Sequence, residues 1–142
     1  MNSSGTMEYG WKNSELRTYL NGEVLQSLDI KDYIVPVNKT SNYFFPETNT
    51  EIVSDSLWIP SYREVTGRNT FESTSCVYSD VFDLDDNSTR LEYNSEYTAW
   101  YWWLRDAVSD TKCAYVNNGG SPISNGTGSN QSLYGVMLCF ST

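Results

Sequence analysis

The chain has 142 residues, a length that suits one domain with its own hydrophobic core. It is acidic, with a formal net charge of −9, and its nine Lys and Arg residues are scattered. This argues against nucleic acid as a partner, because phosphate binding needs clustered cations. The sequence contains no histidine, which excludes Ser-His-Asp and Cys-His catalysis and any zinc site built on histidine.

No apolar run approaches the roughly 18 residues of a membrane span, so we expect no membrane insertion. The opening, MNSSGTMEYG, lacks the basic and apolar regions of a signal peptide. We therefore expect either that the chain is not secreted by that route or that a leader or a larger parent protein precedes it. We predict residues 1–9 as an N-terminal extension and residues 10–142 as a single domain.

The segment GWKNSELRTYLNGEVLQSL, residues 10–28, is the clearest helical pattern. Asn13 or Ser14 can cap its start, and Glu15 suits the positive end of the helix dipole. Apolar residues recur at every fourth position and share one face: Leu16, Leu20, Val24 and Leu28. Asn21-Gly22 interrupts the pattern, which predicts two short helices or one bent helix.

The next segments predict a strand, a loop and a strand that leads into a helix. DYIVPVNKT, residues 32–40, contains Pro36 and favours an edge strand, and SNYFFPETNTE, residues 41–51, is typical of a loop. Residues 57–59 are a predicted strand that Pro60 ends. Ser61 and Glu64 then have the spacing of a capping box, and Gly67 fits the left-handed end of a short helix.

Residues 73–98 are irregular and acidic, with carboxylates at Asp80, Asp83, Asp85 and Asp86. Alternating carboxylates can chelate calcium, but the EF-hand order fails here. Counted from Asp83, the sixth residue is not glycine and the twelfth is Asn94 rather than glutamate. We predict a solvated acidic loop and no metal site.

The last third of the chain is predicted to form strands. In AWYWWLRDA, residues 99–107, alternation places Trp100, Trp102 and Leu104 on one face, which we expect in the core. The other face, expected to be partly exposed, holds Tyr101, Trp103 and Arg105. CAYVN, residues 113–117, and LYGVMLCF, residues 133–140, alternate in the same way. Cys113 and Cys139 then share a face of neighbouring strands, and we hypothesise a disulfide between them. The alternative is that all three cysteines, including Cys76, are small buried hydrophobic residues.

Sixteen residues, 117–132, separate the last two predicted strands, and long loops on rigid sheets often carry binding. We predict a ligand-binding surface there, next to the aromatic strands. The residues expected to hydrogen-bond a ligand are Asn117, Asn118, Ser121, Ser124, Asn125, Asn130 and Tyr134. Tyr101, Trp103 and Tyr115 are expected to stack against it, with Arg105 on the same face.

The order of these segments resembles the DUF6273 domain, which is common in surface and tail-associated proteins of gut Firmicutes and their phages. The most specific parts are the Trp-x-Asn-Ser-x-Leu-Arg-x-Tyr-Leu-Asn opening and the Trp-Trp-Leu-Arg strand. The resemblance implies an α+β, C-type lectin-like fold, with two short helices packed on a small twisted antiparallel sheet with long loops. The family usually ends in Gly-Val-Arg-Pro, whereas residues 135–138 read Gly-Val-Met-Leu here.

With this resemblance, the sequence favours a non-catalytic module that binds a cell-surface glycan or protein, without a cofactor. Such a module fits an extracellular phage receptor-binding or tail protein, or a bacterial adhesin. A variant of this hypothesis is a binding protein diversified by a retroelement. The calcium motifs of sugar-binding lectins, Glu-Pro-Asn, Gln-Pro-Asp and Trp-Asn-Asp, do not occur.

Three alternatives stay open. The first is a structural or oligomerisation module of a fibre, including a homo-oligomer formed through a larger parent protein. The second is an enzyme like those that generate formylglycine, which would use Cys113 and Cys139. The third is a glycosidase that uses carboxylates from residues 80–86 with Glu92 or Glu96.

Overall fold

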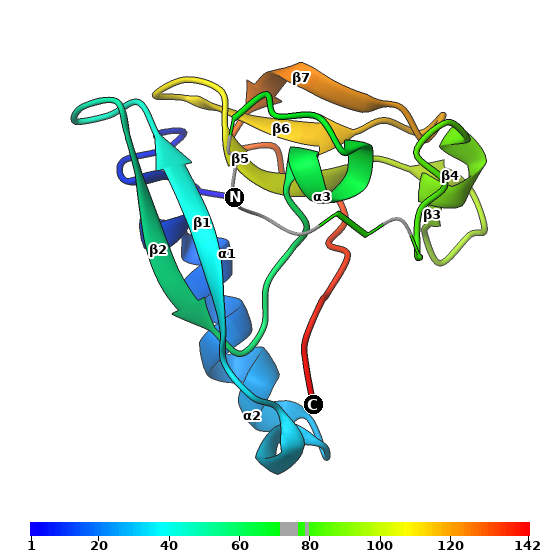
Figure 1. Ribbon diagram of the computed structural model, residues 1–142, viewed down its shortest axis with the longest axis horizontal. Helices are drawn as coiled ribbons and strands as arrows, with labels where there is room; N and C mark the ends of the chain where they lie inside the picture. Colours follow the sequence, from blue (N-terminus) through cyan, green and yellow to red (C-terminus); the bar gives the residue numbers. More distant parts are fainter. Residues whose placement is uncertain (72–76, 79) are drawn as a thin grey trace.

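The computed structural model describes residues 1–71, 77–78 and 80–142 and shows an α+β architecture. Short helices accompany three small antiparallel sheets, where the sequence predicted one sheet (Figure 1). The helical elements are η1 (Gly10–Asn13), α1 (Glu15–Tyr19), η2 (Leu20–Val24), α2 (Leu25–Ser27), η3 (Lys31–Tyr33), α3 (Tyr62–Thr66) and η4 (Asn87–Arg90). The strands are β1 (Val37–Tyr43), β2 (Asn49–Asp55), β3 (Glu92–Tyr93), β4 (Ala99–Trp100), β5 (Trp102–Ala107), β6 (Lys112–Val116) and β7 (Pro122–Gly128).

The predicted N-terminal helix forms as α1, η2 and α2 in direct succession. The Ser14 side chain caps it by accepting a hydrogen bond from the Arg17 backbone N–H. The π-helical turn η2 contains the Asn21-Gly22 interruption, which confirms an irregular helix at that point. Leu20 is buried in the core, and the other apolar residues of the same helical face, Leu16, Val24 and Leu28, pack against that core.

The β1–β2 hairpin extends further than the sequence predicted. Ser41 pairs with Glu51 and Tyr43 pairs with Asn49, so the predicted loop over residues 41–51 is confined to residues 44–48. The capping box before α3 is confirmed: Ser61 accepts from the Glu64 backbone, and Glu64 accepts from the Ser61 backbone. Gly67 ends α3 with a φ of +72°.

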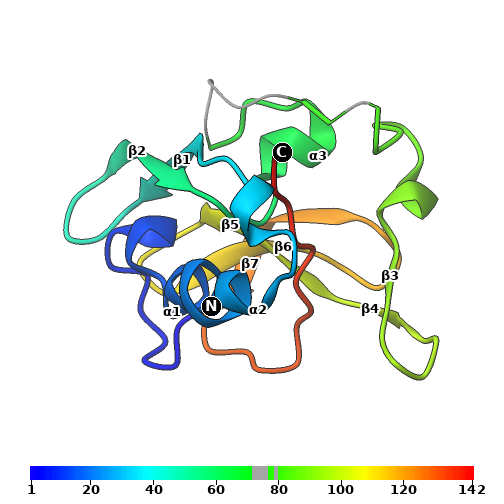
Figure 2. The same cartoon turned by 90° about the horizontal axis from the view of Figure 1, so that it is seen from below.

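The sheet β5-β6-β7 lies at the centre of the fold, with the N-terminal helix on one side and α3 on the other (Figure 2). The strand β7 occupies residues 122–128, so the predicted sixteen-residue loop is wrong. These residues instead complete the sheet by pairing with β6. The predicted strand over residues 133–140 is also wrong: two isolated bridges hold this segment, one from Gly135 to Trp102 and one from Cys139 to Trp58.

Two hydrophobic clusters cover the two faces of this sheet. Alternation along β5 is confirmed, because Trp102 and Leu104 enter the cluster that contains Tyr62 and Val65 of α3. Trp103 and Ala107 enter the other cluster, next to Trp11 and the N-terminal helix. Every side chain of β5 is therefore buried. Within residues 1–9, Asn2 and Met7 are buried, and Met7 belongs to the second cluster.

Candidate functional site

The structure brings together the four aromatic residues that the sequence proposed for ligand binding. Tyr134, from the C-terminal segment, lies between Trp103 of β5 and Tyr115 of β6, with ring centroids 4.5 and 5.2 Å away. Tyr101 stacks on Tyr134 at 5.2 Å. We call these four residues the aromatic cluster. Three of them are half-buried, so the cluster offers ring edges rather than a free platform.

The expected exposure of two predicted site residues is wrong. Trp103 is 2% exposed and Arg105 is 1% exposed, because core residues cover both faces of β5. Trp100, expected in the core, is half-buried at the end of β4. The sequence placed Trp102 and Trp103 correctly on opposite faces of β5, but alternation does not reveal whether the second face is covered.

The polar residues predicted for binding do not converge on one point. The Asn117 side chain accepts hydrogen bonds from the backbone N–H groups of Gly119 and Ser121, at 2.9 and 3.0 Å, and so holds the β6–β7 turn. The Ser121 hydroxyl accepts from the Asn87 amide. The remaining four are exposed along the turn, β7 and the segment after it: Asn118, Ser124, Asn125 and Asn130.

A buried ionic network, which the sequence analysis did not predict, lies beside β5. Arg105 pairs with Glu64 through two hydrogen bonds, from Nη1 to Oε2 at 2.5 Å and from Nη2 to Oε1 at 3.1 Å. Lys39 of β1 donates from Nζ to Glu64 Oε1 at 3.1 Å. Arg105 also donates to the carbonyl oxygens of Thr40 and Ile59. One capping residue of a short helix thus compensates two cations buried between α3, β1 and β5.

The Glu64 carboxylate stays charged in this network. Burial by itself raises the pKa of Glu64, but the charge and hydrogen bonds of Arg105 and the charge of Lys39 lower it more. The net shift is below the ordinary value.

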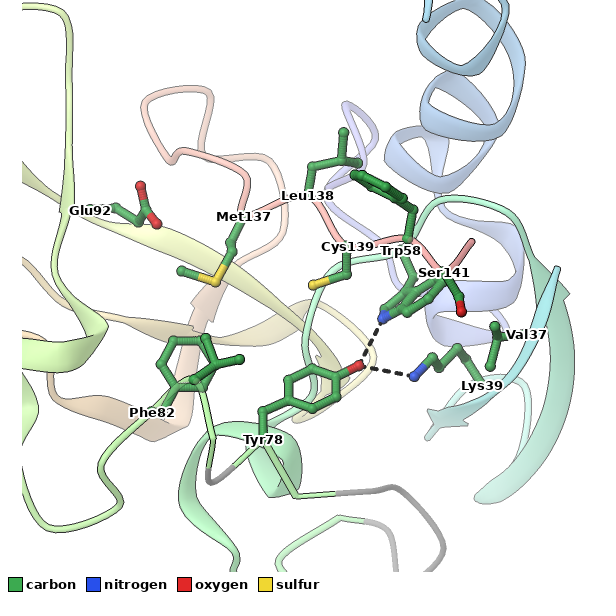
Figure 3. Close-up of a pocket in the computed structure, with 12 residues that line it drawn as sticks. Val37, Lys39, Trp58, Tyr78, Phe82, Glu92, Met137, Leu138, Cys139 and Ser141 are labelled. Atoms are coloured by element: carbon green, nitrogen blue, oxygen red, sulfur yellow. Dashed lines mark hydrogen bonds between the residues drawn. The ribbon is translucent and has the colours of Figure 1, made fainter. Parts of the chain in front are cut away.

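An open cavity of about 590 Å³ lies against this network (Figure 3). Its walls are mainly apolar and aromatic: Tyr78 and Phe82 lie on one side, and Trp58 lies beside Cys139 of the C-terminal segment on the other. The described residues that line it are Val37, Lys39, Trp58, Tyr78, Val81, Phe82, Glu92, Met137, Leu138, Cys139, Phe140 and Ser141. The backbone pairing of Trp58 with Cys139, and of Val35 with Ser141, holds the C-terminal segment in place as this wall.

The Tyr78 hydroxyl connects the cavity to the ionic network. It accepts hydrogen bonds from Trp58 Nε1 and from Lys39 Nζ, each at 3.0 Å. Lys39 Nζ also lies over the Trp58 ring, 4.3 Å from its centroid. Burial, followed by the charge of Glu64, raises the pKa of Tyr78, so its hydroxyl is protonated at neutral pH.

The cysteine prediction is corrected. Cys113 and Cys139 are both free thiols, because Cys139 pairs with Trp58 rather than with a strand beside β6. Burial raises the pKa of Cys113, and burial together with the charge of Glu64 raises the pKa of Cys139 to about 11. Cys76 lies outside the described residues.

Two carboxylates of the acidic segment, Asp83 and Asp86, hydrogen-bond to its local backbone. Asp86 caps η4 through the Ser88 N–H, and Asp83 Oδ1 accepts from the Asp85 N–H. Within the described residues no three His, Cys, Asp or Glu side chains are grouped to hold a metal ion. Over the same residues, no helix is long and apolar enough to cross a membrane.

The family assignment rests on nearly the whole chain, because residues 1–140 match the model of a domain of unknown function, DUF6273. The chain belongs to the DUF6273 family. Comparison with curated proteins found no match, and neither did comparison with solved structures. This membership carries no activity with it, so the functional argument for this DUF6273 domain rests on its own residues.

The sequence analysis missed the residues that form the cavity. Lys39, Trp58, Tyr78 and Cys139 come from four segments spread over 100 residues, and no local spacing connects them. The sequence did contain one signal: Lys39 lies within a predicted strand. If a lysine side chain in a strand faces the core, it needs a buried acidic partner.

Proposed function

We propose that this DUF6273 domain is a non-catalytic binding module whose cavity takes part of a cell-surface glycan or protein. The observation that carries the proposal is the cavity itself. It is concave, mainly apolar and aromatic, and edged by a few polar groups from Lys39, Tyr78, Glu92 and Ser141. Its volume of about 590 Å³ lies within the range of small-molecule sites, roughly 300–1,000 Å³.

The shape of the cavity suits insertion of one group from a larger ligand. It is open rather than enclosed, and its rim carries exposed apolar side chains, Val81 at 66% and Phe140 at 43%. Exposed apolar residues at the edge of a pocket are favourable contact points for a partner. The aromatic cluster and the exposed polar side chains of the β6–β7 region form a second candidate surface for the same receptor.

A binding role without catalysis is supported by the state of the nucleophiles. A thiol with a raised pKa is protonated at neutral pH and is a weak nucleophile, which applies to Cys113 and Cys139. Glu64 is occupied by two cations and does not face a reacting group. Among the described residues, Glu92 is the one carboxylate on the cavity wall, where glycoside hydrolysis uses a pair.

We extend the proposal to fold and location. Short helices around small antiparallel sheets, with long irregular segments, are compatible with a C-type lectin-like domain, as the DUF6273 resemblance implies. A receptor-binding role places the protein outside the cell, on a virion or a bacterial surface.

The test is binding of the labelled protein to arrayed bacterial glycans and to whole bacterial cells, with and without EDTA. Val81→Asp alters the cavity rim, and Ile52→Asp is its matched control, since Ile52 is 58% exposed on β2 and does not line the cavity. We expect Val81→Asp to weaken binding at least tenfold and Ile52→Asp to leave it within twofold.

Tyr101→Ala and Asn118→Ala test the second surface in the same assay. Loss of binding in these two variants, with Val81→Asp unaffected, would move the site to the aromatic cluster. Loss with EDTA would show that a metal ion is required. Absence of binding to every surface, together with an oligomer on a calibrated column, would favour the structural module instead.

A further inference from the structure

We infer that the ligand group accepted by the cavity is an apolar, aromatic-sized body that ends in a carboxylate, which binds at Lys39 and Tyr78. The inference rests on the proposed function, because it assumes that the cavity is the binding site. It goes further by naming the chemical class of the group and the two side chains that select it.

The first argument is charge. Lys39 and Arg105 share the carboxylate of Glu64, which accepts two hydrogen bonds from Arg105 and one from Lys39. The side chain of Lys39 is 7% exposed, so its ammonium group is poorly solvated. A buried ammonium that shares its counter-ion with another cation is stabilised by a further anion, which the cavity can supply at Lys39.

The second argument is the number of hydrogen-bond donors. An indole and an ammonium group can only donate, so the Tyr78 hydroxyl accepts from both Trp58 and Lys39 and keeps its own proton to donate. Lys39 has three N–H donors, of which Glu64 and Tyr78 take two. Across the ranges 1–71, 77–78 and 80–142, neither leftover donor is assigned an acceptor.

These two donors point to an acceptor with two oxygens. Lys39 Nζ and Tyr78 Oη are 3.0 Å apart, so one carboxylate can accept a hydrogen bond from each. Hydrogen bonds between an ammonium and a carboxylate are stronger than neutral ones, particularly away from water.

The remaining walls define the rest of the ligand. From the Tyr78 corner, Phe82 and Met137 lead across the cavity toward Glu92 on the opposite side (Figure 3). Burial raises the pKa of Glu92, and its carboxyl group at that end disfavours a second anion. The geometry therefore favours an apolar body with a single carboxylate, held at the Lys39 end.

The experiment uses three probes of the same shape and different charge: 3-phenylpropionate, 3-phenylpropanamide and 3-phenylpropylamine. Their dissociation constants for the full chain are measured by calorimetry and by protein-observed NMR titration. We expect the carboxylate to bind at least tenfold more tightly than the amide and the amine to bind weakest. Lys39→Met is expected to remove the preference for the carboxylate, and Tyr78→Phe is expected to weaken carboxylate binding about threefold to tenfold.

Lys31→Met is the matched control, because Lys31 is exposed in η3. Among the described residues, its ammonium group hydrogen-bonds to Gln26 alone. It should keep the preference. If Lys39→Met does not fold, the probe series on the wild type and Tyr78→Phe still carry the test.

Equal affinity for carboxylate and amide would overturn the inference while leaving the cavity as a binding site. The inference also fails, and the cavity remains the binding site, if no probe binds but Val81→Asp still abolishes cell binding. If no probe binds and cell binding is insensitive to Val81→Asp, both the inference and the proposed cavity function fail.

Discussion

Replacing Glu64 by glutamine removes a negative charge that pairs with both Lys39 and Arg105. Glutamine has nearly the same shape and can still accept the hydrogen bond from the Ser61 backbone, which Glu64 accepts at 2.7 Å. The perturbation is therefore electrostatic: the two cations keep their buried positions and lose their ion pairs with Glu64.

The expected loss of stability is large, because Glu64 is 0% exposed and Arg105 is 1% exposed. Breaking a buried ion pair by removing one partner costs about 3–5 kcal/mol. A domain of this kind has a total free energy of unfolding of roughly 5–15 kcal/mol. We therefore expect Glu64→Gln to remove between about a fifth of the stability and all of it.

The assay is urea denaturation, followed by tryptophan fluorescence at pH 7. Glu23→Gln is the matched control, since Glu23 is exposed on the N-terminal helix and should change stability by no more than about 0.5 kcal/mol. A double-mutant cycle with Arg105→Met should give a coupling energy above about 1 kcal/mol. Arg105→Met alone should also destabilise, because it leaves Glu64 with Lys39 only.

The pH dependence has a definite sign. Because the folded state lowers the pKa of Glu64, its contribution to stability is fully present above the unfolded pKa, about 4.3, and is lost as pH falls through the folded value. The difference between wild type and Glu64→Gln should therefore shrink below about pH 4. A loss under 1 kcal/mol at pH 7, or a difference that grows in acid, would refute the network as a stabilising element.

Further variants test local packing and thiol chemistry. Gly10→Ala should destabilise by more than about 2 kcal/mol in chemical denaturation, since its Cβ would lie 2.1 Å from the Asn42 carbonyl oxygen at a φ of +57°. Gly22→Ala, with open space at the Cβ position, should instead stabilise by about 0.5–1 kcal/mol, and equal effects would contradict this contrast. Trp103→Ala should cost about 3–5 kcal/mol as a core truncation, whereas a loss below 1 kcal/mol would show an exposed ring. Alkylation with peptide mapping at pH 7.5 should leave Cys113 unmodified and label Cys139 slowly; fast labelling of either thiol would contradict its raised pKa.

Local features of this fold were predictable from the sequence. The cap at Ser14, the Ser61–Glu64 capping box and the left-handed Gly67 each depend on residues within a few positions of one another. The alternation of Trp102 and Trp103 onto opposite faces follows from the pleat of a strand. Family membership also came from the order of such local segments.

Other predictions failed because they depend on residues that are distant in the chain. The residues of β7 look like a loop, rich in Gly, Ser and Asn, yet pairing with β6 satisfies their backbone and makes them a strand. The C-terminal segment alternates like a strand, yet it finds only single bridges, to Trp58 and Trp102. In each case the availability of a partner strand decided the outcome, rather than the propensity of the residues.

The sequence by itself determined the caps, the helical face, the two faces of β5 and the aromatic composition of the neighbouring surface. Only the tertiary structure decided that both faces of β5 are covered, that Glu64 forms ion pairs with Arg105 and Lys39, and that four distant segments line a cavity. The physical reason is the separation along the chain over which each effect acts: helix caps, turns and side-chain periodicity depend on residues a few positions apart. Burial and ion pairing depend on which segments meet in space.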